Sequence, residues 1–174
     1  VEGEEIVLNT EKISLKDIIS SVVKEFELIT ENKNINMTLE LNTSKQFNIL
    51  GDRDKIKQVI INLLSNAVKF TPKQGEIDIV LKEADEKVIL KIEDTGIGIK
   101  EEDLPYIFER LYRGDKSRHE MEGSGIGLTI VRNILTLHKA NIEVKSKEGA
   151  GCVVTVKFNE VLWLTSRKQK SGDG

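Results

Sequence analysis

The sequence has little of what marks a secreted, membrane-spanning or nucleic-acid-binding protein. Its 174 residues include a single cysteine, so no internal disulfide can form. The longest apolar runs, such as "VLWL", are a few residues, whereas a membrane span needs about 20. No basic and apolar signal segment opens the chain, and the net charge of -3 indicates no nucleic-acid partner. We therefore expect a globular domain in a reducing, cytoplasmic setting.

The length and the spacing of apolar residues predict one α+β domain. The chain is long enough for one well-buried core and too short for two, so we expect a domain over residues 1–160 and a polar, disordered tail over 161–174. Helical periodicity covers residues 14–30, 52–70 and 126–138, and a short helical stretch covers 101–112. Strands are expected at residues 4–10, 35–42, 76–83, 87–94, 141–146 and 152–158. These elements predict a two-layer α/β sandwich, a mixed, mostly antiparallel sheet packed against three helices.

The first of these helices shows how the pattern is used. Ser14 is the expected N-cap, with Asp17 three residues later at the capping-box spacing. The stripe expected to face the core consists of Leu15, Ile18, Ile19, Val22, Val23, Phe26 and Ile29.

The second helix, which contains "NLLSNAVKF", has a narrow polar wedge on an otherwise apolar surface. The wedge holds Asn62, Asn66 and Lys69, and asparagine is unfavourable inside a helix because its side chain competes for backbone hydrogen bonds. One interpretation is an ordinary solvent-facing side. The other is a site, since amide oxygens are suited to Mg²⁺ and a lysine is suited to a phosphate.

The strand "KVILKIED" ends in an aspartate on its apolar face. Val88, Leu90, Ile92 and Asp94 alternate with polar neighbours, so the Asp94 carboxylate is directed towards the core. A buried charge without a partner costs several kcal/mol, so we expect a partner. Asp94 is either a turn or cap residue, or it accepts a hydrogen bond from a ligand donor such as an exocyclic amine. Gly96 and Gly98 directly after it permit positive φ and close backbone approach.

A glycine-rich segment, "GSGIGLTIV", opens the third helix after a polar loop that we expect to be mobile. Gly123, Gly125 and Gly127 there form either an anion site at the helix N-terminus or a flexible hinge. The segment lacks the Lys-Ser/Thr ending of a Walker loop and does not follow a strand, which excludes the standard nucleotide-binding motifs. Arg113 follows the apolar "IFERLY" and is the loop cation best placed to reach a phosphate, although loop charges are commonly only solvated.

The order of these four segments is more specific than any one of them. "NLLSNAVKF", "DTGIGI", "IFERLYRGD" and "GSGIGL" resemble the N, G1, F and G2 boxes of the catalytic, ATP-binding domain of bacterial sensor histidine kinases. That domain belongs to a wider group with the DNA gyrase, mismatch-repair and heat-shock chaperone ATPases. The resemblance covers about residues 4–158 and implies the Bergerat fold with a mobile ATP lid at about residues 110–124.

The resemblance also implies roles for individual residues. Asn66 would bind Mg²⁺, Asn62 would lie near the phosphates, and Lys69 would hold a phosphate. Phe70 would pack beside the adenine, and Asp94 would accept from its amino group in a pocket shaped by Gly96 and Gly98. Tyr112 and Arg113 would lie at the base of the lid, and Arg113 and Lys69 would act in catalysis. The phosphates would be cradled by Gly123, Ser124, Gly125, Ile126, Gly127 and Leu128.

The expected activity is that of a protein-histidine kinase domain in a two-component signalling system. It would bind ATP and Mg²⁺ and present the γ-phosphate to a histidine on a dimerisation domain outside this chain, upstream of a response regulator. Neither His119 nor His138 is expected to be that acceptor, so the chain alone should not phosphorylate itself. Dimerisation is expected through the helical domain of the parent, so this chain alone should be monomeric. An anti-sigma-type serine kinase and a non-catalytic nucleotide-binding module are the alternatives, and the parent protein can be a membrane sensor.

Three positions depart from the family pattern. Leu111 stands where a second aromatic residue is usual, so the packing under the lid can differ. Ala140 and Asn141 replace a common glycine pair after the third helix. Cys152 stands where serine or threonine is usual, which leaves the nearby polar network open.

Overall fold

The computed structural model describes residues 7–108 and 124–161, with the side chains of the last helix from Leu128 onward. Its helices are α1 (Leu15–Asn32), α2 (Arg53–Phe70) and α3 (Ser124–Leu137), with a short 3-10 turn at Leu104–Tyr106. Its strands are β1 (Glu11–Ser14), β2 (Asn36–Leu41), β3 (Asn48–Gly51), β4 (Glu76–Ala84), β5 (Lys87–Asp94), β6 (Asn141–Ser146) and β7 (Cys152–Asn159).

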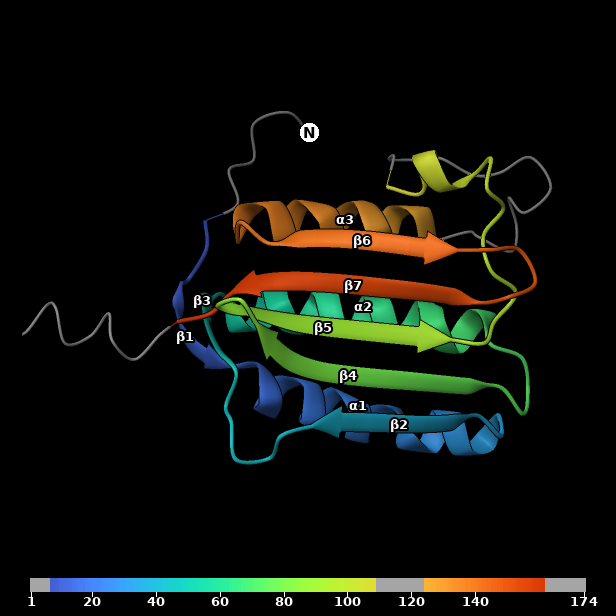
Figure 1. Cartoon of the computed structure of the whole chain (residues 1–174), viewed down its shortest axis with the longest axis horizontal. Helices are drawn as coiled ribbons and strands as arrows, with labels where there is room; N and C mark the ends of the chain where they lie inside the picture. Colours follow the sequence, from blue (N-terminus) through green and yellow to red (C-terminus); the bar gives the residue numbers. More distant parts are fainter. Residues whose placement is uncertain (1–6, 109–123, 162–174) are drawn as a thin grey trace, which may run out of the picture.

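A five-stranded sheet carries the helices on one of its faces (Figure 1). The strand order is β2-β4-β5-β7-β6, in which β2 and β4 pair in parallel and the other neighbours are antiparallel. A separate antiparallel pair, β1 with β3, lies at one end of the molecule. The predicted two-layer sandwich of a mixed, mostly antiparallel sheet under three helices is confirmed.

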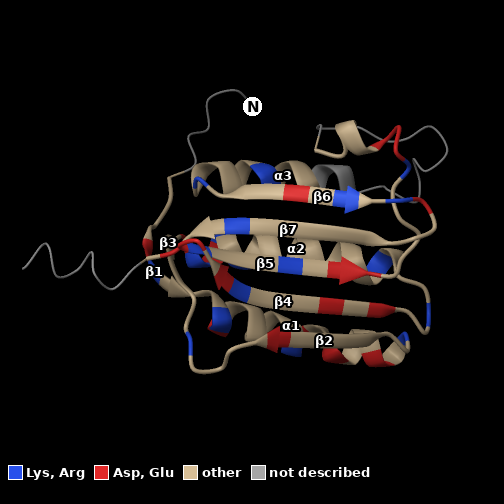
Figure 2. Ribbon diagram, in the orientation of Figure 1, with Lys and Arg blue, Asp and Glu red and all other residues tan. Residues whose placement is uncertain are grey.

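The core lies between the helix layer and the covered face of the sheet. From α1, α2 and α3 it takes buried residues such as Ile19, Ile60 and Val131, and from the sheet it takes Leu90 and Val156. The other face of the sheet carries charged residues of both signs along β4 to β7 (Figure 2). One apolar and one wet face explain the alternating pattern that identified the strands.

Local sequence signals set the helix starts and the tight hairpin. The hydroxyl of Ser14 accepts from the backbone N–H of Asp17 at 3.2 Å, and the carboxylate of Asp52 accepts from Lys55 N–H at 3.2 Å. Both are N-caps, and Ser14 is the one named in the sequence analysis. Between β4 and β5 the chain turns on two residues, 85 and 86, which both have positive φ and thus match the twist of the strands.

Three sequence expectations about the elements need correction. Residues 7–10 are not a strand; the strand at this end is Glu11–Ser14, which pairs with the unpredicted Asn48–Gly51. The described part of the 101–112 segment is turns around a three-residue 3-10 helix rather than a longer helix. Ile29 is 50% exposed, and Thr30, at 3% exposure, takes its place in the core.

None of the helices in residues 7–108 and 124–161 combines the length and the apolar character that crossing a membrane requires.

Candidate functional site

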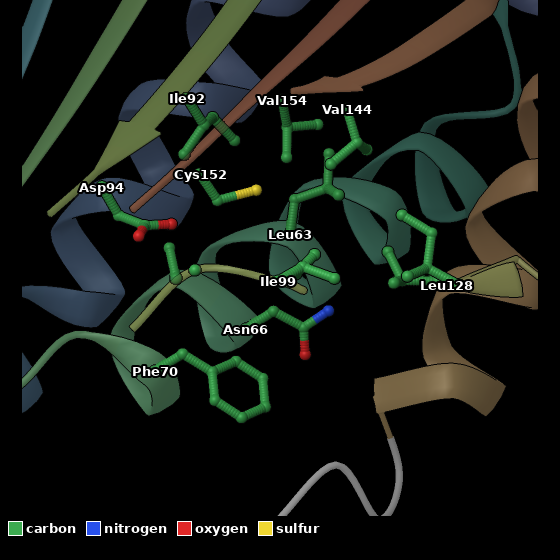
Figure 3. A pocket seen from close by; sticks show the side chains of 13 residues that line it. Leu63, Asn66, Phe70, Ile92, Asp94, Ile99, Leu128, Val144, Cys152 and Val154 are labelled. Atoms are coloured by element: carbon green, nitrogen blue, oxygen red, sulfur yellow. The ribbon is translucent and has the colours of Figure 1, made fainter. Parts of the chain in front are cut away.

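A pocket opens between α2, α3 and the covered face of the sheet, at the end where β5 finishes and β7 begins (Figure 3). Its walls are mainly apolar, with Asp94, Asn66 and Cys152 as the polar side chains. Figure 3 shows Asp94 and Cys152 on the sheet side and Asn66 and Phe70 on the helix side. The apolar lining includes Leu63, Ile92, Ile99, Leu128, Val144 and Val154. A largely apolar cavity with a few convergent polar groups is the usual form of a small-molecule site.

Asp94 occupies the buried position that the strand alternation predicted. Its side chain is 9% exposed, and its Oδ1 accepts from the backbone N–H of Gly96 at 2.8 Å. Burial raises the pKa of the carboxyl above its ordinary value, and backbone hydrogen bonds from Gly96 and Cys152 act in the opposite direction. The expected partner of the buried charge is thus a backbone amide. The bond from Gly96 agrees with the interpretation of Asp94 as a turn residue. Asp94 also lines the pocket, where its role as an acceptor for a ligand stays a prediction.

The turn after Asp94 requires its glycines for close approach. A Cβ on Gly96 would lie 2.6 Å from the carbonyl oxygen of Phe70, at the end of α2. Gly98 has φ of +73°, and a Cβ there would lie 2.1 Å from the carbonyl oxygen of Lys147. Between them, Ile97 N–H donates to the Phe70 carbonyl at 3.2 Å. The turn is therefore fixed against both α2 and the β6–β7 hairpin, and this fixes the position of Asp94.

The polar wedge of α2 is only partly a solvent face. Asn62 and Asn66 are half-buried, and Asn66 lines the pocket together with Phe70. Lys69 is exposed, with its Nζ 5.5 Å from the centre of the Phe70 ring. Since i and i+4 residues share a helix face, Asn62 lies one turn before Asn66 on the same side. The wedge is therefore exposed to solvent at Lys69 and part of the pocket wall at Asn66, and the ligand-binding roles of these residues stay predictions.

The residues predicted to hold phosphates are described only in part. The backbone of Ser124 to Gly127 forms the first turn of α3, two residues earlier than the sequence predicted, and Leu128 is buried in the pocket wall. Tyr112, Arg113 and Gly123, like the proposed lid and Leu111, lie outside the described residues. The first turn of a helix offers unpaired backbone N–H groups to an anion.

A metal ion bound here would have few protein ligands. No cluster of three or more His, Cys, Asp or Glu side chains is found in residues 7–108 and 124–161. Asn66 presents a neutral amide oxygen at the pocket, which fits Mg²⁺ because this ion commonly takes one or two protein oxygens and completes its shell with phosphates and water. The donor set thus suits a metal that arrives with a nucleotide.

Cys152 replaces the usual hydroxyl without breaking the polar network behind it. Burial and the nearby Asp94 charge raise the pKa of the thiol to about 12, so it is protonated at neutral pH. The hydroxyl of Ser146 accepts from Ile99 N–H at 2.8 Å and donates to the Gly151 carbonyl at 2.7 Å. Ser146 and Gly151 were not singled out from the sequence; their only signals were an exposed-looking strand end and a glycine turn.

His138 has a structural role that the sequence interpretation understated. Its Nε2 accepts from the backbone N–H of Asp52 at 3.0 Å, and its Nδ1 donates to the Ile134 carbonyl at 2.7 Å. The imidazole therefore links the end of α3 to the start of α2. Both ring nitrogens are thus engaged in hydrogen bonds to the backbone.

Comparison with known proteins identifies the family to which this chain belongs. Residues 51–162 match the family model described as "Histidine kinase-, DNA gyrase B-, and HSP90-like ATPase". The sensor histidine kinase YclK of Bacillus subtilis is 32% identical over 171 residues, covering 97% of this chain and 35% of the relative. YkoH of the same organism is 35% identical over 148 residues, covering 79% of this chain and 32% of the relative. The chain thus spans about a third of the length of these relatives.

A solved structure has the same fold. The nucleotide-free catalytic domain of histidine kinase ThkA superposes with a TM-score of 0.75 at 28% identity, covering 87% of this chain and 96% of that one. Fold, motif order and sequence identity agree. The chain therefore belongs to the family of histidine kinase-, DNA gyrase B- and HSP90-like ATPases, and within it this is a catalytic, ATP-binding domain of the sensor histidine kinase type.

Proposed function

We propose that the pocket binds the adenine of ATP and that the domain presents the γ-phosphate to a histidine on another domain. The observation that carries the proposal is the Asp94 carboxylate, buried at the wall of an otherwise apolar pocket. Apolar walls accommodate a flat ring, and a carboxylate can only accept a hydrogen bond. Adenine offers an amino group at its six-position, whereas guanine has a carbonyl oxygen there that a carboxylate would repel. Asp94 therefore accounts for selection of adenine.

Other residues beside the pocket would contact the ring, the metal ion and the phosphates. Phe70 and Leu128 flank the ring, Asn66 supplies the metal ligand, and Asn62 continues the polar face one turn away. Mg²⁺ would neutralise charge on the phosphates during transfer. Lys69 lies on the helix surface one turn beyond Asn66, where it can reach a phosphate.

Phosphate binding is completed by the glycine-rich start of α3 and by the segment before it. In this proposal the first-turn N–H groups of Ser124 to Gly127 face the phosphates, with Gly123 as the hinge. Arg113 and Tyr112 act from the base of the lid. Positioning and charge neutralisation supply most of the catalysis in phosphoryl transfer, so these residues need no covalent role.

The phosphate acceptor must come from elsewhere in the parent protein. Both ring nitrogens of His138 are occupied by hydrogen bonds to Asp52 and Ile134, so His138 cannot act as a nucleophile without losing them. We propose a histidine on a helical dimerisation domain of the parent and a response regulator as the next acceptor. The named relatives are sensor histidine kinases, which favours this assignment over an anti-sigma-type serine kinase or a non-catalytic module.

A labelling experiment tests the proposal. The chain is incubated with γ-labelled ATP and Mg²⁺, alone and with the separately produced histidine-containing segment of its parent. We expect label on the added segment, stable to alkali and lost in acid as for phosphohistidine, and none on the chain alone. Strong labelling of the isolated chain would contradict the proposal, and so would acid-stable label on the partner, which would indicate a serine kinase.

A further inference from the structure

A second groove lies at the end of the domain away from the nucleotide pocket. There β3, the end of β7 and the end of α3 meet, at the opposite ends of the strands from Asp94 and Cys152 (Figure 1). The β3 groove, as we name it, has a volume of about 420 Å³, within the range of ligand-sized pockets. It is lined by residues that include Ile49, Leu50, His138, Lys139, Phe158 and Val161.

The floor of the β3 groove is buried, but its rim is not. Ile49 and Phe158 are each 2% exposed, whereas the side chain of Leu50 is 57% exposed. Leu137, directly before His138, is 43% exposed. Leu50 thus presents an exposed apolar side chain at the rim, against which another apolar segment can pack.

The backbone edge of β3 also faces this groove. The register with β1 and the bond from Leu15 N–H to the Phe47 carbonyl direct residues 47, 49 and 51 towards β1. Asn48, Leu50 and Asp52 therefore face the other edge. Two of them are engaged there: the Asn48 carbonyl accepts from Val161 N–H at 2.9 Å, and Asp52 N–H donates to His138 Nε2 at 3.0 Å. Leu50 lies between these two contacts.

The sequence after Val161 supplies a fitting occupant. We propose that the segment Leu162–Leu164 docks in the β3 groove with the Trp163 side chain against Leu50 and Phe158. Val161 already lines the groove and is hydrogen-bonded to β3, so the chain leaves the described region at the groove itself. Three extended residues span about 10 Å, which is enough to cross it. The next nine residues, "SRKQKSGDG" after Thr165, are polar, so the apolar "LWL" is the part that gains from burial.

Docking would have a consequence for α2. The groove contains His138, whose bond to Asp52 N–H holds the N-cap of the helix that carries Asn62 and Asn66. A bulky aromatic ring over this bond would exclude water from it and so strengthen it. The terminal segment would therefore act as a cover that stabilises the start of α2.

Trp163 is the only tryptophan, so its fluorescence tests the docking directly. In the full chain we expect emission shifted to the blue of that in denaturant, with acrylamide quenching reduced severalfold. Leu50→Glu should shift the emission to the red, whereas the control Leu28→Glu, at a site on α1 that is 66% exposed, should not. Emission like that of the unfolded chain would overturn the proposal, as would blue-shifted emission that ignores Leu50→Glu. Blue-shifted emission that disappears on dilution would assign the groove to a second copy and overturn it too.

Two shortened chains separate docking from other effects of the tail. A chain ending at Thr165 keeps "LWL" and loses the polar tail, whereas a chain ending at Val161 loses both. We expect the first to keep the urea midpoint of the full chain and the second to unfold at lower urea. Equal midpoints for both would contradict a stabilising cover. Neither result depends on nucleotide binding.

Discussion

Replacing Asp94 by asparagine separates recognition of the nucleotide from stability of the fold. The Oδ1 atom of Asp94 accepts from Gly96 N–H at 2.8 Å, and an asparagine can keep this bond with its own oxygen. Its NH₂ group then faces the pocket, where the adenine amino group is also a donor. The variant should therefore retain the turn and lose the acceptor for adenine.

The size of the effect follows from the bond that is lost. A hydrogen bond to a charged group contributes about 1.5–3 kcal/mol, so its loss should increase the dissociation constant about 10- to 150-fold. Two facing donors place the expected loss towards the upper end of this range. Calorimetric titration with ATP and Mg²⁺ measures this loss of affinity. Glu93→Gln is the control: it also removes one negative charge, but from the adjacent carboxylate on the exposed face of β5.

The same substitution makes a prediction about pH and stability. Burial raises the pKa of Asp94 in the folded chain, so its contribution to stability is complete below the unfolded pKa and is lost as the pH rises through the folded pKa. Above the folded pKa the ionised Asp94 is therefore a cost, and there Asp94→Asn should leave the free energy of unfolding equal or higher. Conversely, ATP binding to the wild type should weaken as the pH falls through the raised pKa. Unchanged ATP affinity in Asp94→Asn would refute the role given to this carboxylate.

Three further predictions follow from the geometry. Gly98→Ala should lower the free energy of unfolding by more than about 1–2 kcal/mol, which is the cost of a left-handed backbone for an L-residue, because its Cβ would also meet the Lys147 carbonyl. Urea unfolding measures this change, and a wild-type midpoint would contradict the prediction. Lys139→Gly should raise the free energy of unfolding by about 1 kcal/mol, since Lys139 has φ of 56° after α3, whereas Lys139→Ala should change little; equal effects in thermal unfolding would argue against backbone strain. Cys152, the only cysteine, should react slowly with N-ethylmaleimide at pH 8 because its pKa is about 12. Saturating ADP should slow the reaction further, and a rate that ADP leaves unchanged would argue against nucleotide binding beside Cys152.

The elements that carry the site were predictable because each has a strong local signal. Asp52 and the Thr71-Pro72 pair mark the two ends of α2, and strict alternation along β5 places Asp94 inside. The order of the four motifs then assigned a function that no single motif carried. The helix wheel alone could not decide whether Asn66 faces water, because that depends on which elements pack beside α2.

The errors arose where long-range contacts decide the structure. β3 has four residues and no clear alternation, and its strand geometry comes from pairing with β1, more than thirty residues away in sequence. Ile29 shares the apolar stripe of α1 but lies near the helix end and is 50% exposed, so the stripe is not covered along its whole length. Periodicity identifies the residues that share a face; it does not say how far along the helix the face is covered.

The departures from the family pattern are resolved for two of the three positions. Lys139 adopts the left-handed conformation that a glycine would take more readily, and Ala140 is buried at 8% exposure, so the chain turns after α3 without the glycine pair. Ser146 maintains the polar network beside Cys152. Leu111 lies outside the described residues.

The central claim, that the pocket between α2, α3 and the sheet holds adenine against Asp94, is tested most directly by a crystal structure with Mg²⁺ and a non-hydrolysable ATP analogue. We predict the adenine amino group within hydrogen-bonding distance of the Asp94 carboxylate, the ring between Phe70 and Leu128, and the metal on the side-chain oxygen of Asn66. An analogue bound elsewhere, or an adenine in this pocket without contact to Asp94, would contradict the account.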